Sequence, residues 1–139
     1  MNTTAPVEIV ENNPTIKGRN RYQILSRGLK AKRGVMNKTE AEWAAVLTQD
    51  PDVAQWWFEP LTLRLSHPRE GQPARLTPDF MILLQSGITI FDDVKGTGLD
   101  DPASAVRMKA AAELFGLWKF RIVKKRTKSQ GGGYDVREL

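Results

Sequence analysis

The sequence has no cysteine and only one histidine, His67. The absence of cysteine excludes disulfides, thiolate nucleophiles and zinc-thiolate sites. A single histidine disfavours both a histidine-based metal centre and a Ser-His-Asp triad. If the protein is an enzyme, carboxylates and lysine must therefore perform its chemistry.

Long apolar runs are absent as well. No segment approaches the roughly 18 to 20 apolar residues that span a bilayer. Residues 1–14 have neither the basic start nor the apolar centre of a secretory signal. These features predict a cytoplasmic protein with no membrane partner. The length of 139 residues, with 40% hydrophobic and 27% charged residues, predicts a single folded domain.

Positive charge is in excess. The net charge is +5, and the basic residues are concentrated in the segments 17–38 and 119–128. Such clusters favour a polyanionic partner, nucleic acid above all, although flexible solvated segments have the same composition. We expect residues 1–35 to form a flexible basic arm, residues 36–126 the folded core and residues 127–139 a C-terminal tail.

Residues 38–49 have the pattern of a helix. They are good helix formers that follow a capping residue at Asn37 or Thr39 and stop before an Asp-Pro pair. At 100° per residue, Glu40 lies on the same face as Trp43 and Leu47. This helix should therefore turn Glu40 toward the rest of the domain.

A second helix is predicted from Pro102 to the neighbourhood of Gly116. Asp101 supplies an N-cap, Pro102 occupies the first helical position, and Gly116 supplies a stop. The residues expected to form its apolar stripe are Ala103, Val106, Ala110, Leu114 and Leu117.

Four segments have the pattern of strands. Residues 56–65 alternate as one strand with a single covered face, bent near its proline. Residues 77–84 and 88–94 are apolar at nearly every position, which is typical of strands covered on both faces. Residues 118–125 alternate again and form a final strand.

A short turn between the second and third strands sets their register. If the turn is centred on Ser86, Ile82 pairs with Ile90 and Asp79 pairs with Asp93. Side chains opposed in this way have Cβ atoms about 4.5 to 5.5 Å apart and share a face. Lys95 points to that face too. A glycine bulge in the turn would shift the register by one residue.

Two opposed carboxylates repel each other, so a partly buried pair needs either a cation between them or a proton on one of them. A hard divalent metal ion suits the oxygen ligands available. With Glu40 added, three carboxylates and the Lys95 ammonium form a group suited to metal-assisted hydrolysis of phosphodiesters. Taken singly, each of these residues is more often a cap, a strand end or an exposed acid. We expect the neighbouring Asp92 near an open edge, in a structural role.

These residues resemble the signature of the PD-(D/E)xK nuclease superfamily: a helical Glu, then Pro-Asp at the start of a strand, then an acid, any residue and Lys on the next strand. The matching residues here are Glu40, Pro78-Asp79 and Asp93-Val94-Lys95. Within the superfamily, residues 36–126 are similar to small phage-encoded nucleases and to junction-resolving endonucleases, which places such a protein in a bacterial host cell.

The resemblance implies an α/β fold with a restriction-endonuclease-like αβββαβ core, in which helices flank a mixed central sheet. It also implies an endodeoxyribonuclease with Glu40, Asp79, Asp93 and Lys95 as catalytic residues. Mg²⁺ or Mn²⁺ would be bound by Asp79, Asp93 and the main-chain carbonyl of Val94, with Glu40 binding through water. Lys95 would position the nucleophile.

DNA is the expected partner. Junction-resolving enzymes usually act as dimers, so a homodimer is a candidate assembly by analogy. The alternatives are a module of the same fold that binds nucleic acid without cutting it and, below it, a basic structural protein. The residues expected to contact nucleic acid are Arg19, Arg21, Arg27, Lys30, Lys32, Arg33, Lys38, Arg107, Lys109, Lys124 and Lys125.

Overall fold

The computed structural model describes residues 7–9, 34–65, 75–98 and 101–139. It is an α/β fold with a mixed five-stranded sheet of order β2-β5-β6-β7-β8 and a three-stranded sheet of order β1-β3-β4. The helices are α2 (Lys38–Gln49), α3 (Pro102–Leu114) and the short 3₁₀ helix η2 (Lys128–Gln130). The strands are β1 (Val7–Ile9), β2 (Val53–Phe58), β3 (Leu61–Arg64), β4 (Arg75–Leu76), β5 (Phe80–Leu84), β6 (Thr89–Lys95), β7 (Lys119–Lys125) and β8 (Tyr134–Glu138).

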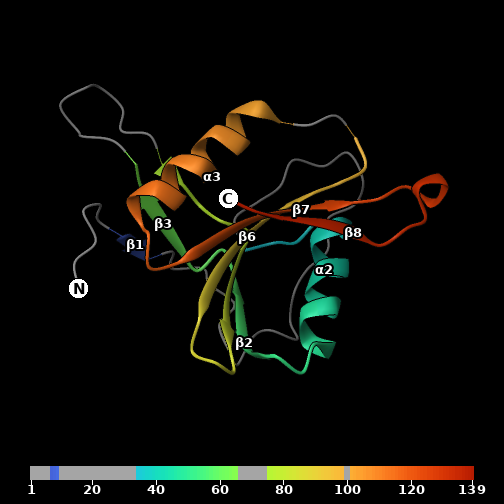
Figure 1. Ribbon diagram of the computed structural model, residues 1–139, viewed down its shortest axis with the longest axis horizontal. Helices are drawn as coiled ribbons and strands as arrows, with labels where there is room; N and C mark the ends of the chain where they lie inside the picture. Colours follow the sequence, from blue (N-terminus) through green and yellow to red (C-terminus); the bar gives the residue numbers. More distant parts are fainter. Residues whose placement is uncertain (1–6, 10–33, 66–74, 99–100) are drawn as a thin grey trace.

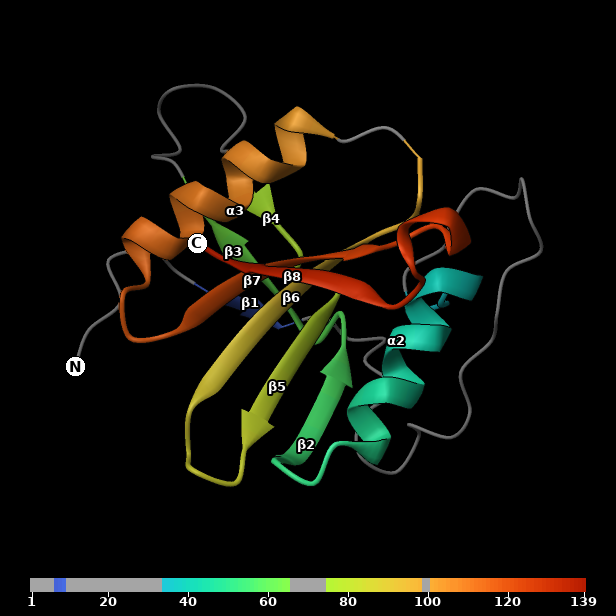
Figure 2. The same cartoon turned by 45° about the vertical axis from the view of Figure 1, so that its right-hand side comes forward.

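The two long helices cover opposite faces of the five-stranded sheet (Figures 1 and 2). Successive side chains of a strand point to opposite faces, so each strand contributes to two cores. On the α2 side, Ile90 of β6 packs with Trp43 and Leu47. On the α3 side, Phe91 packs with Met108, together with residues of the three-stranded sheet. Neither α2 nor α3 has the length and apolar character of a membrane-crossing helix, and no other described segment does.

Both long helices begin where the sequence predicts. Asn37 caps α2 in a capping box: its side chain accepts from the Glu40 N–H, and the Glu40 side chain accepts from the Asn37 N–H. Asp101 caps α3, and Pro102 occupies its first turn.

The buried face of α3 differs from the expected stripe. Its buried residues are Ser104, Met108 and Ala111, whereas Val106 is 68% exposed and Leu117 67% exposed. Small alanines occur all around this helix, so apolar periodicity does not select a face. The large Met108 and the polar contacts of Ser104 select it instead.

The segment 56–65, expected to be one strand, is divided between the two sheets. Residues 53–58 form β2, which pairs with β5, and residues 61–64 form β3, which pairs with β1 and β4. The chain bends at Glu59, whose φ is 46°, and the next residue, Pro60, has no N–H to donate to a ladder.

The hairpin has the expected register, because Ile82 pairs with Ile90 and Phe80 with Asp92. No bulge shifts it, and Gly87 in the turn takes a left-handed φ of 90°. The β6 strand is central: it pairs with β5 on one side and runs parallel to β7 on the other.

Two terminal expectations need correction. Residues 7–9, expected in a loose arm, form β1 beside β3. Residues 134–138, expected in a tail, form β8, the edge strand antiparallel to β7. The alternation that marks a strand was too short to detect in either segment. The basic segment from Lys17 to Arg33 lies outside the described residues.

Candidate active site

The acids of the hairpin meet at one end of the central sheet. Asp79 lies directly before β5, and Asp93 lies near the end of β6. The two acids lie close enough for the charge of Asp93 to raise the pKa of Asp79. The main-chain N–H of Val94 donates to Oδ2 of Asp79 at 2.7 Å, which holds this acid against the neighbouring strand. The β5–β6 ladder ends at Phe80 and Asp92, and Asp79 and Asp93 lie one residue beyond this last pair.

The Asp79 carboxyl is in an unfavourable place for a negative charge. Burial raises its pKa well above the ordinary value of 3.8, and repulsion by Asp93 and then by Glu40 raises the pKa further. The Val94 N–H acts in the opposite direction. Taken together, these effects disfavour the charged form of Asp79.

Lys95 is fixed on the same face by two partners. Its ammonium nitrogen lies 2.9 Å from Oδ2 of Asp93 and 2.9 Å from Oγ of Ser104. The Ser104 hydroxyl donates to the same Asp93 oxygen at 2.7 Å. Asp101, the cap of α3, is 3.9 Å from the ammonium. The side chain of Lys95 remains 23% exposed, so its ammonium is both positioned and accessible.

Glu40 lies beside the acid pair but is directed toward its own helix cap. Its two carboxylate oxygens accept from the main-chain N–H of Asn37 at 3.1 Å and from Nδ2 of Asn37 at 3.0 Å. Burial raises the pKa of Glu40 from 4.5 to about 7, and the Asn37 N–H partly opposes this shift. Repulsion by Glu59 and Asp93 adds to the increase.

Asp92 does not lie near an open edge, contrary to expectation. It is fully buried on the α2 face of the central strand. Arg121 of β7 donates to both of its oxygens, at 2.7 and 2.8 Å, and Nε1 of Trp43 donates to one at 2.9 Å. Burial raises the pKa of Asp92, while the hydrogen bonds and charge of Arg121 act to lower it. The expected structural role agrees with these contacts.

The carboxylate oxygens of Asp79 and Asp93 are suitable ligands for a hard divalent cation. The hydrogen bonds of Asp79 with Val94 and of Asp93 with Ser104 involve the Oδ2 atom of each acid. Carboxylate oxygens are the ligands that Mg²⁺ prefers. Within the part of the chain that the structure describes, however, no three Asp, Glu, His or Cys side chains converge on a common point. Glu40 would have to leave its cap to complete such a shell.

Only some of the residues expected to contact nucleic acid lie in the described part of the chain. Arg19 to Arg33 lie outside the described residues. Lys38, Arg107 and Lys109 are exposed on the helices. Lys125 is 2.7 Å from Oε1 of Glu42, an ion pair that offsets its charge. Lys124 lies next to Lys95 in the parallel register of β6 and β7.

Ser104 is the site residue that the sequence reasoning missed. It occupies the third helical position after the Asp101 cap, and its N–H donates to Asp101 at 3.3 Å. A serine there has the ordinary appearance of a helix start. Its burial against Asp93 depends on the packing of α3 across the sheet.

Comparison of the chain with protein-family models finds no match, and comparisons with curated proteins and with solved structures find no significant match. Function is therefore argued from the geometry of the site.

Proposed function

We propose that the protein is a metal-dependent endonuclease that hydrolyses phosphodiester bonds in DNA. The observation that supports this best is the arrangement of Asp79, Asp93 and Lys95. Asp79 and Asp93 interact electrostatically at the end of the β5–β6 hairpin, and the Lys95 ammonium lies 2.9 Å from Asp93. Hydrolysis of a phosphodiester needs an anchored divalent cation and a cationic group near the attacking water.

The order of the elements supports the same proposal. The elements α2, β2, β5, β6, α3 and β7 follow one another in the order α, β, β, β, α, β around the central sheet. This is the order of the restriction-endonuclease-like core that the resemblance implies. When the elements are matched in this order, β3 and β4 are an insertion after the first core strand, and β8 is an additional strand at the edge of the sheet.

Each site residue has a distinct part in the proposed reaction. Asp79, Asp93 and the carbonyl of Val94 would hold Mg²⁺ or Mn²⁺, with Glu40 reaching it through water. The ion would supply a Lewis acid for the phosphate and an acidic bound water. Lys95 orients the nucleophile and offsets charge developing on the phosphate. Ser104 fixes the ammonium of Lys95 relative to Asp93.

The test is a cleavage assay on branched, duplex and single-stranded DNA in Mg²⁺ and in Mn²⁺. We expect wild-type protein to cut at least one of these substrates and chelator to stop the reaction. Asp93→Asn should lower the rate by about a thousandfold, as expected for loss of a metal-binding carboxylate.

Asp52→Asn is the matched control, because Asp52 is an exposed acid in the turn after α2. It should cut at the wild-type rate. Equal background rates for wild type and Asp93→Asn on every substrate would refute the proposal. DNA retention that ignores chelator, with no cutting, would instead indicate a binding module.

A further inference from the structure

The strand β8 forms one edge of the five-stranded sheet (Figure 1). It pairs with β7 on one side, and among the described residues no strand pairs with its other side. Its register with β7 is continuous from Tyr134 to Glu138, and the strand contains neither glycine nor proline. A regular edge of this kind is a template on which a further strand can form a ladder.

The opposite edge of the sheet, β2, is less suited to such pairing. Its register with β5 shifts between Val53 and Gln55. At its other end the chain turns at Glu59, with a φ of 46°, just before Pro60. Bulges and prolines protect the edge of a sheet against a further strand. Since β8 has neither, it is the edge at which a partner strand would bind.

Hydrogen bonds at the two ends of β8 show which of its main-chain groups face outward. The N–H of Leu139 donates to the carbonyl of Phe120, and the N–H of Arg126 donates to the carbonyl of Gly133, both at 2.9 Å. Alternate residues of an antiparallel strand direct their main-chain groups to the same side. The residues in step with Gly133 and Leu139 therefore bond to β7, and residues 134, 136 and 138 direct their N–H and C=O groups to the open side.

The sequence of β8, Tyr-Asp-Val-Arg-Glu, is complementary to itself when two copies pair antiparallel about Val136. In this register the outward N–H and C=O of Val136 bond to those of Val136 in the second copy. Asp135 of each copy then lies opposite Arg137 of the other, in a non-hydrogen-bonded position where opposed side chains are closest. Opposite charges in such positions stabilise a sheet, and like charges destabilise it.

The side chains of this register are accessible to a second copy. The Asp135 side chain is 72% exposed, and its contact with Arg126 is 3.8 Å long. A carboxylate can accept from more than one cation, so this contact leaves room for another. Arg137 is exposed and forms no ion pair within the part of the chain that the structure describes. Val136 is 46% exposed and would be covered by its counterpart.

We propose that two copies of this chain form a symmetric dimer through their β8 strands, which joins the two sheets into one of ten strands. The interface is isologous, with the two-fold axis perpendicular to the sheet at Val136. It consists of five residues from each copy, so the dimer is reversible, with a dissociation constant of about 10 to 100 µM. This inference does not depend on the proposed nuclease function.

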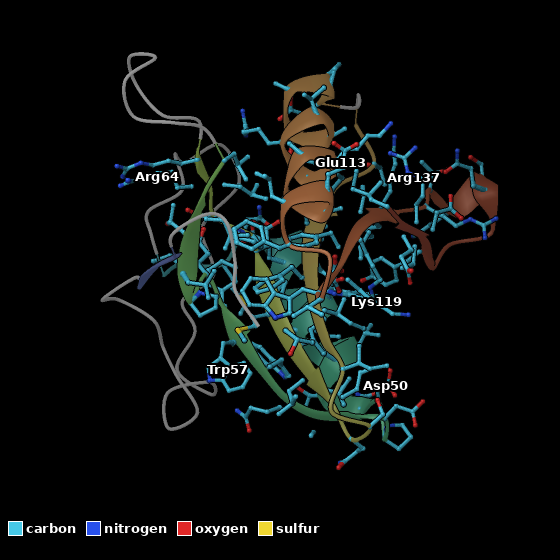
Figure 3. All side chains as sticks on the ribbon, turned by 60° about the vertical axis from the view of Figure 1, so that its left-hand side comes forward. Asp50, Trp57, Arg64, Glu113, Lys119 and Arg137 are labelled. Carbon is cyan, nitrogen blue, oxygen red and sulfur yellow. The ribbon has the colours of Figure 1, made fainter. Side chains whose placement is uncertain are left out.

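The two-fold axis places α3 of both copies on the same side of the joined sheet. Arg137 is on that side, where it lines a hollow together with Ala105 of α3 (Figure 3). Val136 is level with Val123 of β7 and with Val94 of β6, at the centre of the candidate active site. Five strand spacings separate the two β6 strands, so the two sites would lie on one face of the dimer, about 24 Å apart.

Sedimentation velocity of the whole chain, from about 1 µM to about 1 mM, measures the association. At an ionic strength of about 0.15 M, repulsion between two copies of net charge +5 is largely screened. We expect wild type to change from monomer to dimer across this range. Arg137→Asp puts like charges opposite each other at two symmetric positions, so it should weaken the dimer by about tenfold or more.

The exchange of both charges is the decisive variant. Asp135→Arg/Arg137→Asp restores opposite charges across the axis and should dimerise within about threefold of wild type, which a purely structural role of Arg137 does not predict. Arg107→Asp is the matched control, because it makes the same change on an exposed position of α3. It should dimerise as wild type does.

Thermal unfolding verifies that the variants fold. If Arg137→Asp does not, Val136→Pro replaces it: proline removes an outward N–H without a loss to the β7 ladder, and the dimer should be lost. Wild type that stays monomeric up to about 1 mM would overturn the inference. An exchange variant as weak as Arg137→Asp, or a dimer that survives Arg137→Asp, would also overturn it. None of these outcomes affects the test of metal-dependent cleavage with Asp93→Asn.

Discussion

Asp92 and Asp93 are consecutive residues of β6, but they have opposite environments. Asp92 points to the α2 face, where Arg121 and Trp43 donate three hydrogen bonds to it and no exposed surface remains. Asp93 points to the α3 face, where it forms an ion pair with Lys95 and accepts a hydrogen bond from Ser104. A second carboxyl group, that of Asp79, lies close by. Asp92 has a dedicated counter-charge, whereas the cation beside Asp93 also lies 3.9 Å from Asp101.

This difference separates a structural acid from a chemical one. Around Asp92 the Arg121 guanidinium supplies the opposite charge inside the fold, although burial still raises the pKa of the acid. Around Asp79 and Asp93 the fold leaves negative charge in excess, which a bound cation would relieve. Strain of this kind is common at functional sites and reduces stability.

The largest effect should come from Asp92→Ala. This change leaves the guanidinium of Arg121 and Nε1 of Trp43 without the acid, and breaking a buried pair costs about 3 to 5 kcal/mol. Denaturant unfolding measures the loss. Asp93→Asn should change the unfolding free energy by less than about 1 kcal/mol. A small loss for Asp92→Ala, equal to that for Asp93→Asn, would erase the distinction between the two acids.

A divalent metal ion should raise the stability of the folded protein only when Asp79 and Asp93 are present to bind it. A ligand that binds only the folded state adds about 2.7 kcal/mol when its concentration is a hundred times its dissociation constant. We expect Mg²⁺ or Mn²⁺ to raise the thermal midpoint of wild type by several degrees. The double variant Asp79→Asn/Asp93→Asn should show no increase. An equal increase in both proteins would locate the binding elsewhere.

Asp79→Asn should stabilise the metal-free protein. The amide oxygen can still accept from Val94, and the repulsion with Asp93 disappears. Because the folded-state pKa of Asp79 is raised, wild type loses stability as pH rises above about 3.8, the ordinary value. The gain should therefore be about 1 to 2 kcal/mol at pH 8 and near zero at pH 4, measured by denaturant unfolding in EDTA. A gain that does not vary with pH would contradict this origin.

Glu40→Gln should produce a smaller gain than Asp79→Asn. The pKa of Glu40 is raised to about 7, so wild type loses stability as pH rises from about 4.5 to 7. Glutamine keeps the capping box and removes the titration. The variant should gain about 1 kcal/mol over wild type across this pH range, a value reduced for the partial exposure of the group. Parallel stability curves for the two proteins would show that Glu40 is not the titrating residue.

Local signals in the sequence predicted a large part of this arrangement. Turn composition and strand alternation predicted the β5–β6 register and the common face of Asp93 and Lys95, because a hairpin is encoded in consecutive residues. The helix caps at Asn37 and Asp101 were predicted for the same reason. The break between β2 and β3 at Glu59 could not be located from the sequence pattern, because the apolar alternation continues across it.

The sequence by itself determined the hairpin, the two helix starts and the shared face of Asp93 and Lys95. The tertiary structure alone decided which residues meet them. Arg121 reaches Asp92 because β7 crosses over to lie parallel to β6, and Ser104 reaches Asp93 because α3 packs on that face. Such partners are separated along the chain, and their contacts depend on packing across layers, which no local periodicity specifies.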